Sequence, residues 1–212
     1  MKKTILIAAM MVAFIANAQS EKFEAAMKAN LSKFDSAKTL ADYESLAAAF
    51  TRIGDAEKTQ WLPYYWAGLA LSTAGWVDQK ADKDVLGTRI IALCDKVEAL
   101  TTDNADKAEI LVLRNMAATQ QMLVDPQARY MTYGQQAASF LQKGMTLNAN
   151  NPRLYYLQGM SLFNTPEQFG GGKAKAKPVL EKAIALFKAE PVTPLHPHWG
   201  EKDAVSTLAQ CQ

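Results

Sequence analysis

The chain has 212 residues, of which 49% are hydrophobic and 21% are charged, a composition typical of a globular protein. It holds 23 Lys and Arg residues against 21 Asp and Glu residues, and Lys2 and Lys3 account for the formal net charge of +2. Without those two lysines the chain is neutral, so it has no electrostatic attraction for nucleic acid or for an anionic membrane. Two cysteines are too few for a disulfide-stapled scaffold.

Residues 1–18 are predicted to be a signal peptide of bacterial type. The two lysines precede an apolar run from Ile5 to Ile15, and Ala16-Asn17-Ala18 has the small residues of a cleavage site. The run is shorter than the roughly 20 apolar residues that a transmembrane helix needs. We therefore expect a periplasmic or secreted protein with one domain over residues 19–212 and no membrane span after cleavage.

Nearly all of the remaining chain has a helical period, and no alternating strand pattern interrupts it. Helices are predicted over residues 21–36, 40–55, 59–75, 81–100, 105–124, 127–147, 152–163, 177–188 and 199–211. Thr39 suits the N-cap of the second helix, and Pro63 suits the first turn of the third. Three prolines in residues 190–198 predict an extended strap before the terminal helix. The predicted fold class is therefore all-α, with about eight to nine helices.

The two cysteines are not expected to pair. Cys94 lies on the apolar stripe of the fourth helix, where a buried thiol is expected, and Cys211 lies at the frayed end of the chain. In a stack of hairpins each hairpin contacts only its neighbours, so these two distant residues should not meet.

Two residue patterns recur along the chain. Their copies are Tyr64-x3-Gly68-x2-Leu71, Tyr155-x3-Gly159-x2-Leu162, Ala137-x3-Leu141-x2-Gly144 and Ala176-x3-Leu180-x2-Ala183. Small residues at these places allow two helices to approach closely, while the larger ones fill the space between hairpins. Since a single hairpin cannot bury its apolar face alone, the pattern predicts hairpins that stack on one another.

In these residues the chain resembles the tetratricopeptide repeat (TPR) family, and Asn150-Asn151-Pro152 is similar to the turn between its repeats. Units of about 45 residues depart from the 34 of that family. The resemblance implies an α-solenoid of antiparallel helical hairpins, similar to the short exported TPR-like proteins of Gram-negative bacteria. It also implies a concave groove lined by the first helix of each unit.

No catalytic residue, cofactor or metal is predicted. The loop Phe169-Gly-Gly-Gly-Lys173 lacks the first Gly and the Ser or Thr of a phosphate-binding loop, so a flexible connection between helices is expected. His196 and His198 could form a surface metal site, but a local structural role is favoured. In that role Trp199 inserts under the helix of residues 177–188 and both imidazoles bond locally.

The resemblance assigns the groove to one stripe on each of two helices. The candidate partner-binding residues are Leu62, Tyr65, Leu69 and Ser72 in the third helix, with Arg153, Tyr156, Met160 and Phe163 in the seventh. Aromatic residues and Arg are favoured in binding hot spots, and Met adapts to varied partners. The alternative is that the next hairpin or the terminal strap buries these side chains.

The leading hypothesis is an exported, non-enzymatic scaffold that binds a protein or peptide through this groove. A carrier of a small apolar ligand is the first alternative, suggested by the Tyr, Trp and Met residues near the groove. A metal-dependent enzyme that uses His196 and His198 is the second.

Overall fold

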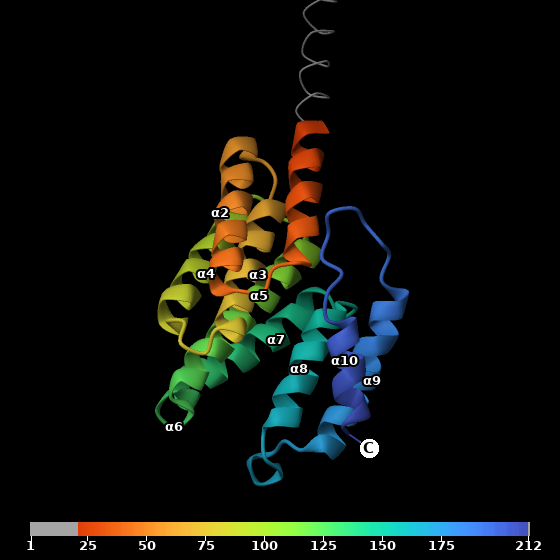
Figure 1. The fold of residues 1–212 in the computed structure, drawn as a ribbon. Coiled ribbons are helices and arrows are strands. Elements are labelled where there is room, and N and C mark those ends of the chain that lie inside the picture. Colours follow the sequence, from red (N-terminus) through yellow and green to blue (C-terminus); the bar gives the residue numbers. More distant parts are fainter. Residues whose placement is uncertain (1–20, 212) are drawn as a thin grey trace, which may run out of the picture.

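The computed structural model describes residues 21–211, and the predicted signal peptide lies outside them. Every regular element in that range is helical and none is a strand, as the sequence predicted. A first helix covers residues 21–34. The elements that follow are α2 (Leu40–Glu57), α3 (Leu62–Val77), α4 (Lys83–Glu98), α5 (Asn104–Val124), α6 (Pro126–Arg129), the π-helical turn η1 (Tyr130–Gly134), α7 (Gln135–Leu147), α8 (Pro152–Asn164), the 3₁₀ turn η2 (Glu167–Phe169), α9 (Lys173–Ala189) and α10 (Glu201–Ala209) (Figure 1).

Short polar side chains begin several of the helices. Thr39 and Asp42 form a reciprocal capping box at the start of α2. Asp82 and Asp103 accept hydrogen bonds from the first-turn amides of α4 and α5, and Asn151 does the same for α8. These caps satisfy amide groups that have no partner within the helix, so the local sequence alone sets these boundaries.

Several predicted helix boundaries differ from the structure, and two of the differences have a clear physical reason. The second helix continues through Gly54 to Glu57, because Gly54 allows a close contact and does not end the helix. A Cβ atom at Gly54 would lie 2.7 Å from the ring of Tyr64. The eighth predicted helix begins at Lys173, so Pro178 lies inside it. Pro178 is exposed, and water can bond the carbonyl group that its missing N–H leaves free.

The helix predicted over residues 127–147 is interrupted. A short helix, α6, is capped by the side chain of Asp125, and the π-helical turn η1 then separates it from α7. The extra residue of a π turn shifts the face that each following side chain occupies. Tyr130, before the shift, is 58% exposed, whereas Ala137 and Leu141 of the recurring pattern, after it, are buried.

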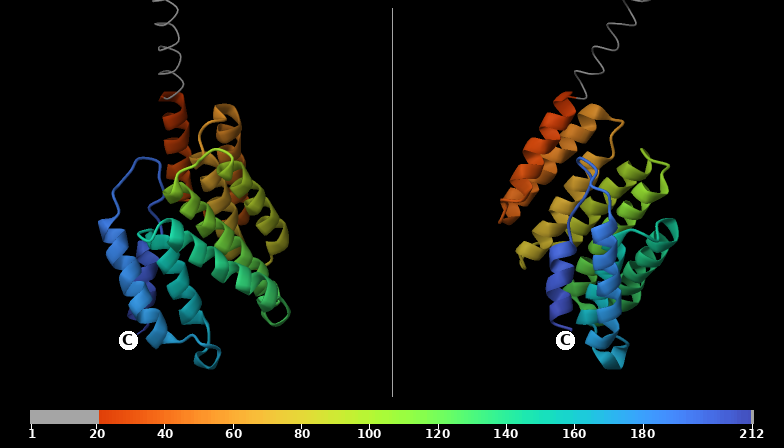
Figure 2. Two further views of the ribbon diagram at one scale, coloured as in Figure 1. Left: turned by 180° about the vertical axis from the view of Figure 1, so that it is seen from behind. Right: turned by 90° about the vertical axis from the view of Figure 1, so that its right-hand side faces the viewer.

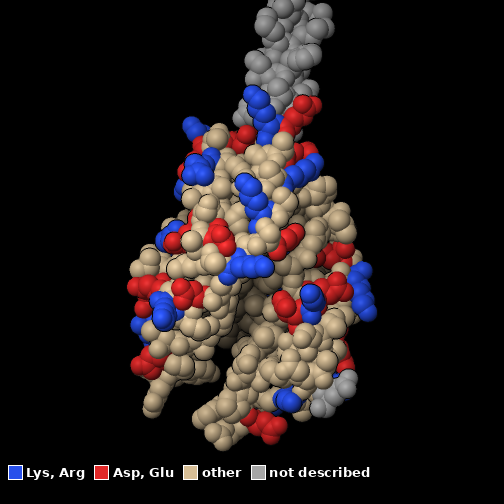
Figure 3. Space-filling view, in the orientation of Figure 1, with Lys and Arg blue, Asp and Glu red and all other residues tan. Residues whose placement is uncertain are grey.

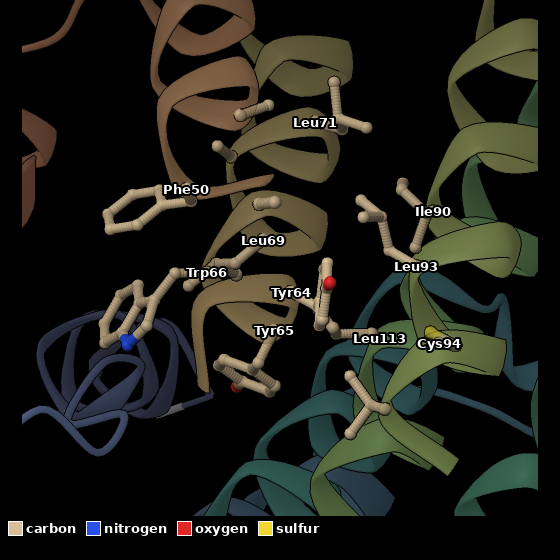
Figure 4. Packing of buried hydrophobic residues seen from close by; sticks show 14 of the residues in the cluster. Phe50, Tyr64, Tyr65, Trp66, Leu69, Leu71, Ile90, Leu93, Cys94 and Leu113 are labelled. Atoms are coloured by element: carbon tan, nitrogen blue, oxygen red, sulfur yellow. The ribbon is translucent and has the colours of Figure 1, made fainter. Parts of the chain in front are cut away.

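Helices that follow one another in sequence pack side by side, and they enclose two apolar clusters. The larger cluster joins the helix of residues 21–34 with α2 to α5 and reaches Leu141 and Leu154. Figure 4 shows its centre, where Phe50 of α2 stacks on Trp66 of α3 with 6.3 Å between ring centroids. The smaller cluster joins α8, α9 and α10. The all-α prediction is confirmed, while the regular stacking of the TPR family stays a prediction.

Glycines of the recurring patterns lie where helices approach closely. A Cβ atom at Gly144 of α7 would lie 2.7 Å from Leu154 of α8. One at Gly159 of α8 would lie 2.6 Å from Leu180 of α9. Real Cβ atoms do not come that close to a neighbour, so a larger residue at either position would require Leu154 or Leu180 to shift. The interpretation of the small residues as close-approach positions is confirmed.

The strap, residues 190–200, leaves the end of α9 and returns to the larger cluster before α10 begins (Figure 2). The indole Nε1 of Trp66 donates a hydrogen bond of 2.8 Å to the carbonyl oxygen of Leu195. Leu195 has a φ of +66°, a left-handed conformation that is unfavourable for a residue with a branched side chain. Contacts with α3 therefore hold the strap in a shape that its own sequence disfavours.

Both cysteines are free thiols. Cys94 is fully buried as predicted, and burial raises the pKa of its thiol to about 12. Cys211 is also buried, so the prediction that it lies at a frayed end is wrong. Its Sγ donates to the carbonyl oxygen of Thr207 at 3.4 Å, and the residue packs in the smaller cluster.

Candidate ligand-binding site

The predicted groove stripe of α3 is covered. Leu62, Tyr65, Leu69 and Ser72 have at most 7% of their surface exposed. The strap accounts for part of this cover, because the Nε1 of its residue Trp199 donates a 3.0 Å hydrogen bond to the hydroxyl oxygen of Tyr65. An open groove along this helix, expected from the sequence, is therefore not present.

The stripe on α8 is covered in a similar way. Arg153 is buried, and Tyr156, Met160 and Phe163 are half-buried. The ring of Tyr156 meets that of Trp199 edge to face at 6.2 Å, and the hydroxyl of Thr207 in α10 donates to the sulfur of Met160. The terminal segment thus lies over both stripes, and a role for these residues in binding a partner stays a prediction.

A buried ionic cluster joins α5, α8 and the start of the strap. The guanidinium group of Arg153 pairs with the carboxylates of Glu109 and Glu190. Glu109 also accepts hydrogen bonds from the hydroxyl of Tyr65 at 2.9 Å and from the side-chain amide of Asn151 at 2.6 Å. Buried charges are costly unless each one is paired and hydrogen-bonded, and here every member has such partners.

Burial and charge act on this cluster in opposite directions. Burial lowers the pKa of Arg153, but the negative charges of Glu109 and Glu190 outweigh it and raise that pKa overall. Burial raises the pKa of Tyr65 well above its usual value, and the charge of Glu109 adds to the shift. Arg153 therefore stays charged and Tyr65 stays a neutral hydrogen-bond donor at physiological pH.

The ionic cluster forms one wall of a cavity of about 530 Å³, here named the strap cavity. This volume falls within the range of small-molecule sites, roughly 300–1,000 Å³. Its walls are Ala105, Asp106, Glu109, Asn148, Asn150, Asn151, Arg153, Leu186, Ala189, Glu190, Pro191, Thr193, His196, Pro197 and His198. The start of α5, the turn before α8, the end of α9 and the strap thus meet around one space.

Both histidines of the sequence line the strap cavity. The Nε2 of His198 lies 3.0 Å from the carbonyl oxygen of Thr193, which requires a hydrogen on that nitrogen. The ring of His196 is held edge to face against Trp61 at 5.7 Å. Within residues 21–211 neither ring nitrogen of His196 makes a hydrogen bond, so this imidazole can offer a lone pair. The predicted local bonding is confirmed for His198, but Trp199 packs on Tyr65 and Tyr156 and not under α9.

Asp106 adds a further carboxyl group to the cavity wall. Burial raises its pKa, and a 2.7 Å hydrogen bond from Thr101 opposes that shift. Together the walls combine one guanidinium, three carboxyl groups, two imidazoles and several amides with the apolar surfaces of Leu186 and the prolines. Such walls suit a ligand that has both an apolar body and polar groups.

A second cavity of about 780 Å³ lies between the helix of residues 21–34 and α2. Small residues such as Ala26 and Ala49 line it, with Lys22, Lys33 and Arg52 also on its walls. It contains no histidine and none of the residues of the ionic cluster.

Figure 3 shows acidic and basic residues interspersed over one face of the protein, with a hollow lined by uncharged residues between its two lower lobes.

Features that suggested other chemistry have structural roles. Gly170 and Gly172 adopt φ values of +89° and +105°, as expected for a glycine connection between helices. Within residues 21–211 no three His, Cys, Asp or Glu side chains gather closely enough to hold a metal ion. None of the described helices has the length and apolar character needed to cross a bilayer.

Sequence reasoning missed Glu109, Glu190 and the link that Arg153 makes between them. A signal for Glu109 was available, because it precedes Ile110, Val112 and Leu113 on a helix that is otherwise apolar on that side. An acidic residue on a buried stripe is rarely tolerated without a partner. The identity of that partner required the fold, since Arg153 lies 44 residues away.

Comparison with known proteins shows a relative among the solved structures. No protein-family model and no curated sequence matches the chain. The solved structure of the HusA haemophore from Porphyromonas gingivalis is similar, with 35% sequence identity and a TM-score of 0.78. The similarity covers 91% of this chain and 92% of the haemophore chain. An identity and a coverage this high show common descent, and the chain therefore belongs to the family of the HusA haemophore.

Proposed function

We propose that this protein is an exported carrier that binds haem or a closely related tetrapyrrole. The similarity to the HusA haemophore, which extends over nine tenths of both chains, is the observation that carries the proposal. A haemophore as relative favours the carrier hypothesis over the peptide-binding scaffold. Residues 1–18, the predicted signal peptide, would direct export, and the proposal includes no catalytic step.

The strap cavity is the place that we propose for the ligand. Haem iron in proteins is commonly held by a histidine, and the imidazole of His196 has a free lone pair on the cavity wall. The two carboxylates of haem need a cationic partner, which Arg153 supplies on the same wall. Leu186 and the prolines of the strap offer apolar surface to the macrocycle.

Haemin titration tests the proposal. Wild-type protein should bind one haemin per chain, with a shift of the Soret absorbance band, and His196→Ala should weaken binding at least about tenfold, or 1.4 kcal/mol. His198→Ala is the matched control, because its Nε2 is already engaged with Thr193, and it should have a smaller effect.

The two parts of the proposal fail separately. Wild-type protein that shows no Soret shift at micromolar haemin would refute the carrier function. Haemin binding that His196→Ala leaves unchanged would refute His196 as the iron ligand, and would direct attention to the cavity between residues 21–34 and α2.

A further inference from the structure

The two carboxylates that bind Arg153 are held very differently. Glu109 projects from the rigid helix α5 and is fixed by Tyr65 and Asn151, and its side chain is 8% exposed. Glu190 is the first residue after α9, has a side chain that is 20% exposed, and lies 3.9 Å from the Nδ1 of His198. Glu109 is thus held on several sides within the core, whereas Glu190 lies closer to solvent and has fewer partners.

The guanidinium group presents a separate edge to each carboxylate. Its Nε and Nη2 atoms contact Glu109, at 2.8 Å for Nε and 2.7 Å for Nη2 to the same oxygen. Its Nη1 and Nη2 atoms bind the two oxygens of Glu190. The second edge belongs to the wall of the strap cavity, because Arg153 and Glu190 both line it. A carboxylate of a bound ligand can reach this edge if Glu190 vacates it.

Such an exchange preserves the charge balance. Arg153 and Glu109 neutralise each other, so Glu190 supplies an additional negative charge on the second edge. A ligand carboxylate in its place would accept the same bidentate hydrogen bonds, and no buried charge would lose its partner. Glu190 would move into water, where an ionised carboxylate is well solvated.

We propose that Arg153 is the residue that binds a carboxylate of the ligand, and that Glu190 occupies its place in the free protein. The inference rests on the proposed function, because the two propionate groups of a tetrapyrrole supply the carboxylate. Departure of Glu190 frees the beginning of the strap, while Trp66 and Tyr65 still hold its other end through Leu195 and Trp199. A carboxylate of the ligand thereby replaces Glu190 as the second partner of Arg153.

The test uses two metal-free probes, protoporphyrin IX and its dimethyl ester, both in dilute detergent. Removing the iron excludes any contribution from His196, and the ester lacks only the carboxylates. The variant is Glu190→Gln in the full mature chain, because a neutral amide competes poorly for Arg153. Glu181→Gln, an exposed position on α9, is the matched control, and circular dichroism checks that helicity is retained.

Glu190→Gln should tighten binding of the diacid by about tenfold or more, since a hydrogen bond to a charged group is worth roughly 1.5–3 kcal/mol. It should change binding of the ester by less than about twofold, within ordinary variation for a surface substitution. Glu190→Asp, which keeps the charge, should bind the diacid nearly as wild type does.

Equal tightening for both probes would overturn the inference, because Glu190 would then act only as a latch on the strap. Unchanged binding of the diacid in Glu190→Gln would overturn it as well. Haemin binding by the same samples separates these results from failure of the carrier function. If no sample binds haemin or either porphyrin, the function and the inference both fall.

Discussion

The two apolar clusters are built on different principles. The larger cluster is filled by big side chains, with Tyr65, Phe50 and Met27 among those with no exposed surface. The smaller cluster depends on alanines and a few larger residues, namely Tyr155, Ala176, Leu180, Ala183, Phe187, Ala204 and Cys211. Its helices are held close together because Gly159 lets α8 approach α9.

The clusters also differ in their polar contacts. Within the larger cluster, the buried amide of Gln120 donates to the carbonyl oxygen of Ser72 and so joins α5 to α3. The smaller cluster is joined to the larger one through Arg153, Glu109 and the strap. In the carrier that we propose, this division would let the larger cluster hold its shape while the thinner region moves.

Arg153→Ala should have the largest effect on this arrangement. It leaves the buried carboxylate of Glu109 without a charged partner, and breaking a buried ion pair in this way costs about 3–5 kcal/mol. The free energy of unfolding from urea titration measures the loss. Arg89→Ala, which removes an exposed pair with Glu44, should cost about 1 kcal/mol or less. A cost for Arg153→Ala as small as that of the control would contradict the importance of the ionic cluster.

Leu180→Ala and Ile90→Ala compare the cores directly, because both side chains have no exposed surface. Each should cost about 2–5 kcal/mol through the cavity left behind. Hydrogen exchange should distinguish them. Leu180→Ala should raise amide exchange selectively in α8 to α10, whereas Ile90→Ala should raise it in all the helices. Equal exchange profiles would show that the two clusters unfold as one unit.

Gly159→Ala should cost about 1–3 kcal/mol, because the added Cβ would lie 2.6 Å from Leu180 and force α8 and α9 apart. The control is Gly170→Ala, where no atom lies within 4 Å and only the positive φ opposes the substitution, at about 1 kcal/mol. Thermal unfolding measures both. A stable Gly159→Ala variant would mean that the helix pair can relax at little cost.

Asp84→Asn should have the smallest effect, because the carboxylate is 44% exposed. A hydrogen bond from Arg129 lowers the pKa of Asp84, so its contribution is present above the pKa of the unfolded chain and is lost as pH falls through the folded pKa. Because solvent screens this pair, Asp84→Asn should lower the free energy of unfolding at pH 7 by about 0.5 kcal/mol. Unfolding measured from pH 7 down to about pH 2 should show the difference between variant and wild type disappear. A difference that persists in acid would contradict an electrostatic origin.

Much of the fold follows from local patterns that can be read in the sequence. Thr39 and Pro63 mark helix starts as predicted, and the small residues at 144 and 159 lie where helices meet. Gly54 misled the prediction, because a glycine needed for close packing has the same appearance in a sequence as one that ends a helix. Pro178 led to a predicted helix start that is too late, because the sequence does not show that this proline is exposed and therefore tolerated inside a helix.

The site was less accessible to sequence reasoning. The repeat resemblance predicts a groove position for Arg153, but its partners lie on α5 and at the end of α9. His196 and His198 were noticed as a pair, yet the cavity that they line includes residues from four separate segments. The residues of the repeat pattern on α3 and α8 are mostly buried, while the terminal segment that covers these helices has no counterpart in the pattern.

By itself, the sequence determined the all-α class, most helix boundaries and the faces that become buried, because helical periodicity and capping act over a few neighbouring residues. Only the tertiary structure decided that the strap closes over α3 and that Arg153 meets Glu109 and Glu190. Contacts between residues far apart in the chain depend on how the helices are arranged in space, and no local pattern encodes that arrangement.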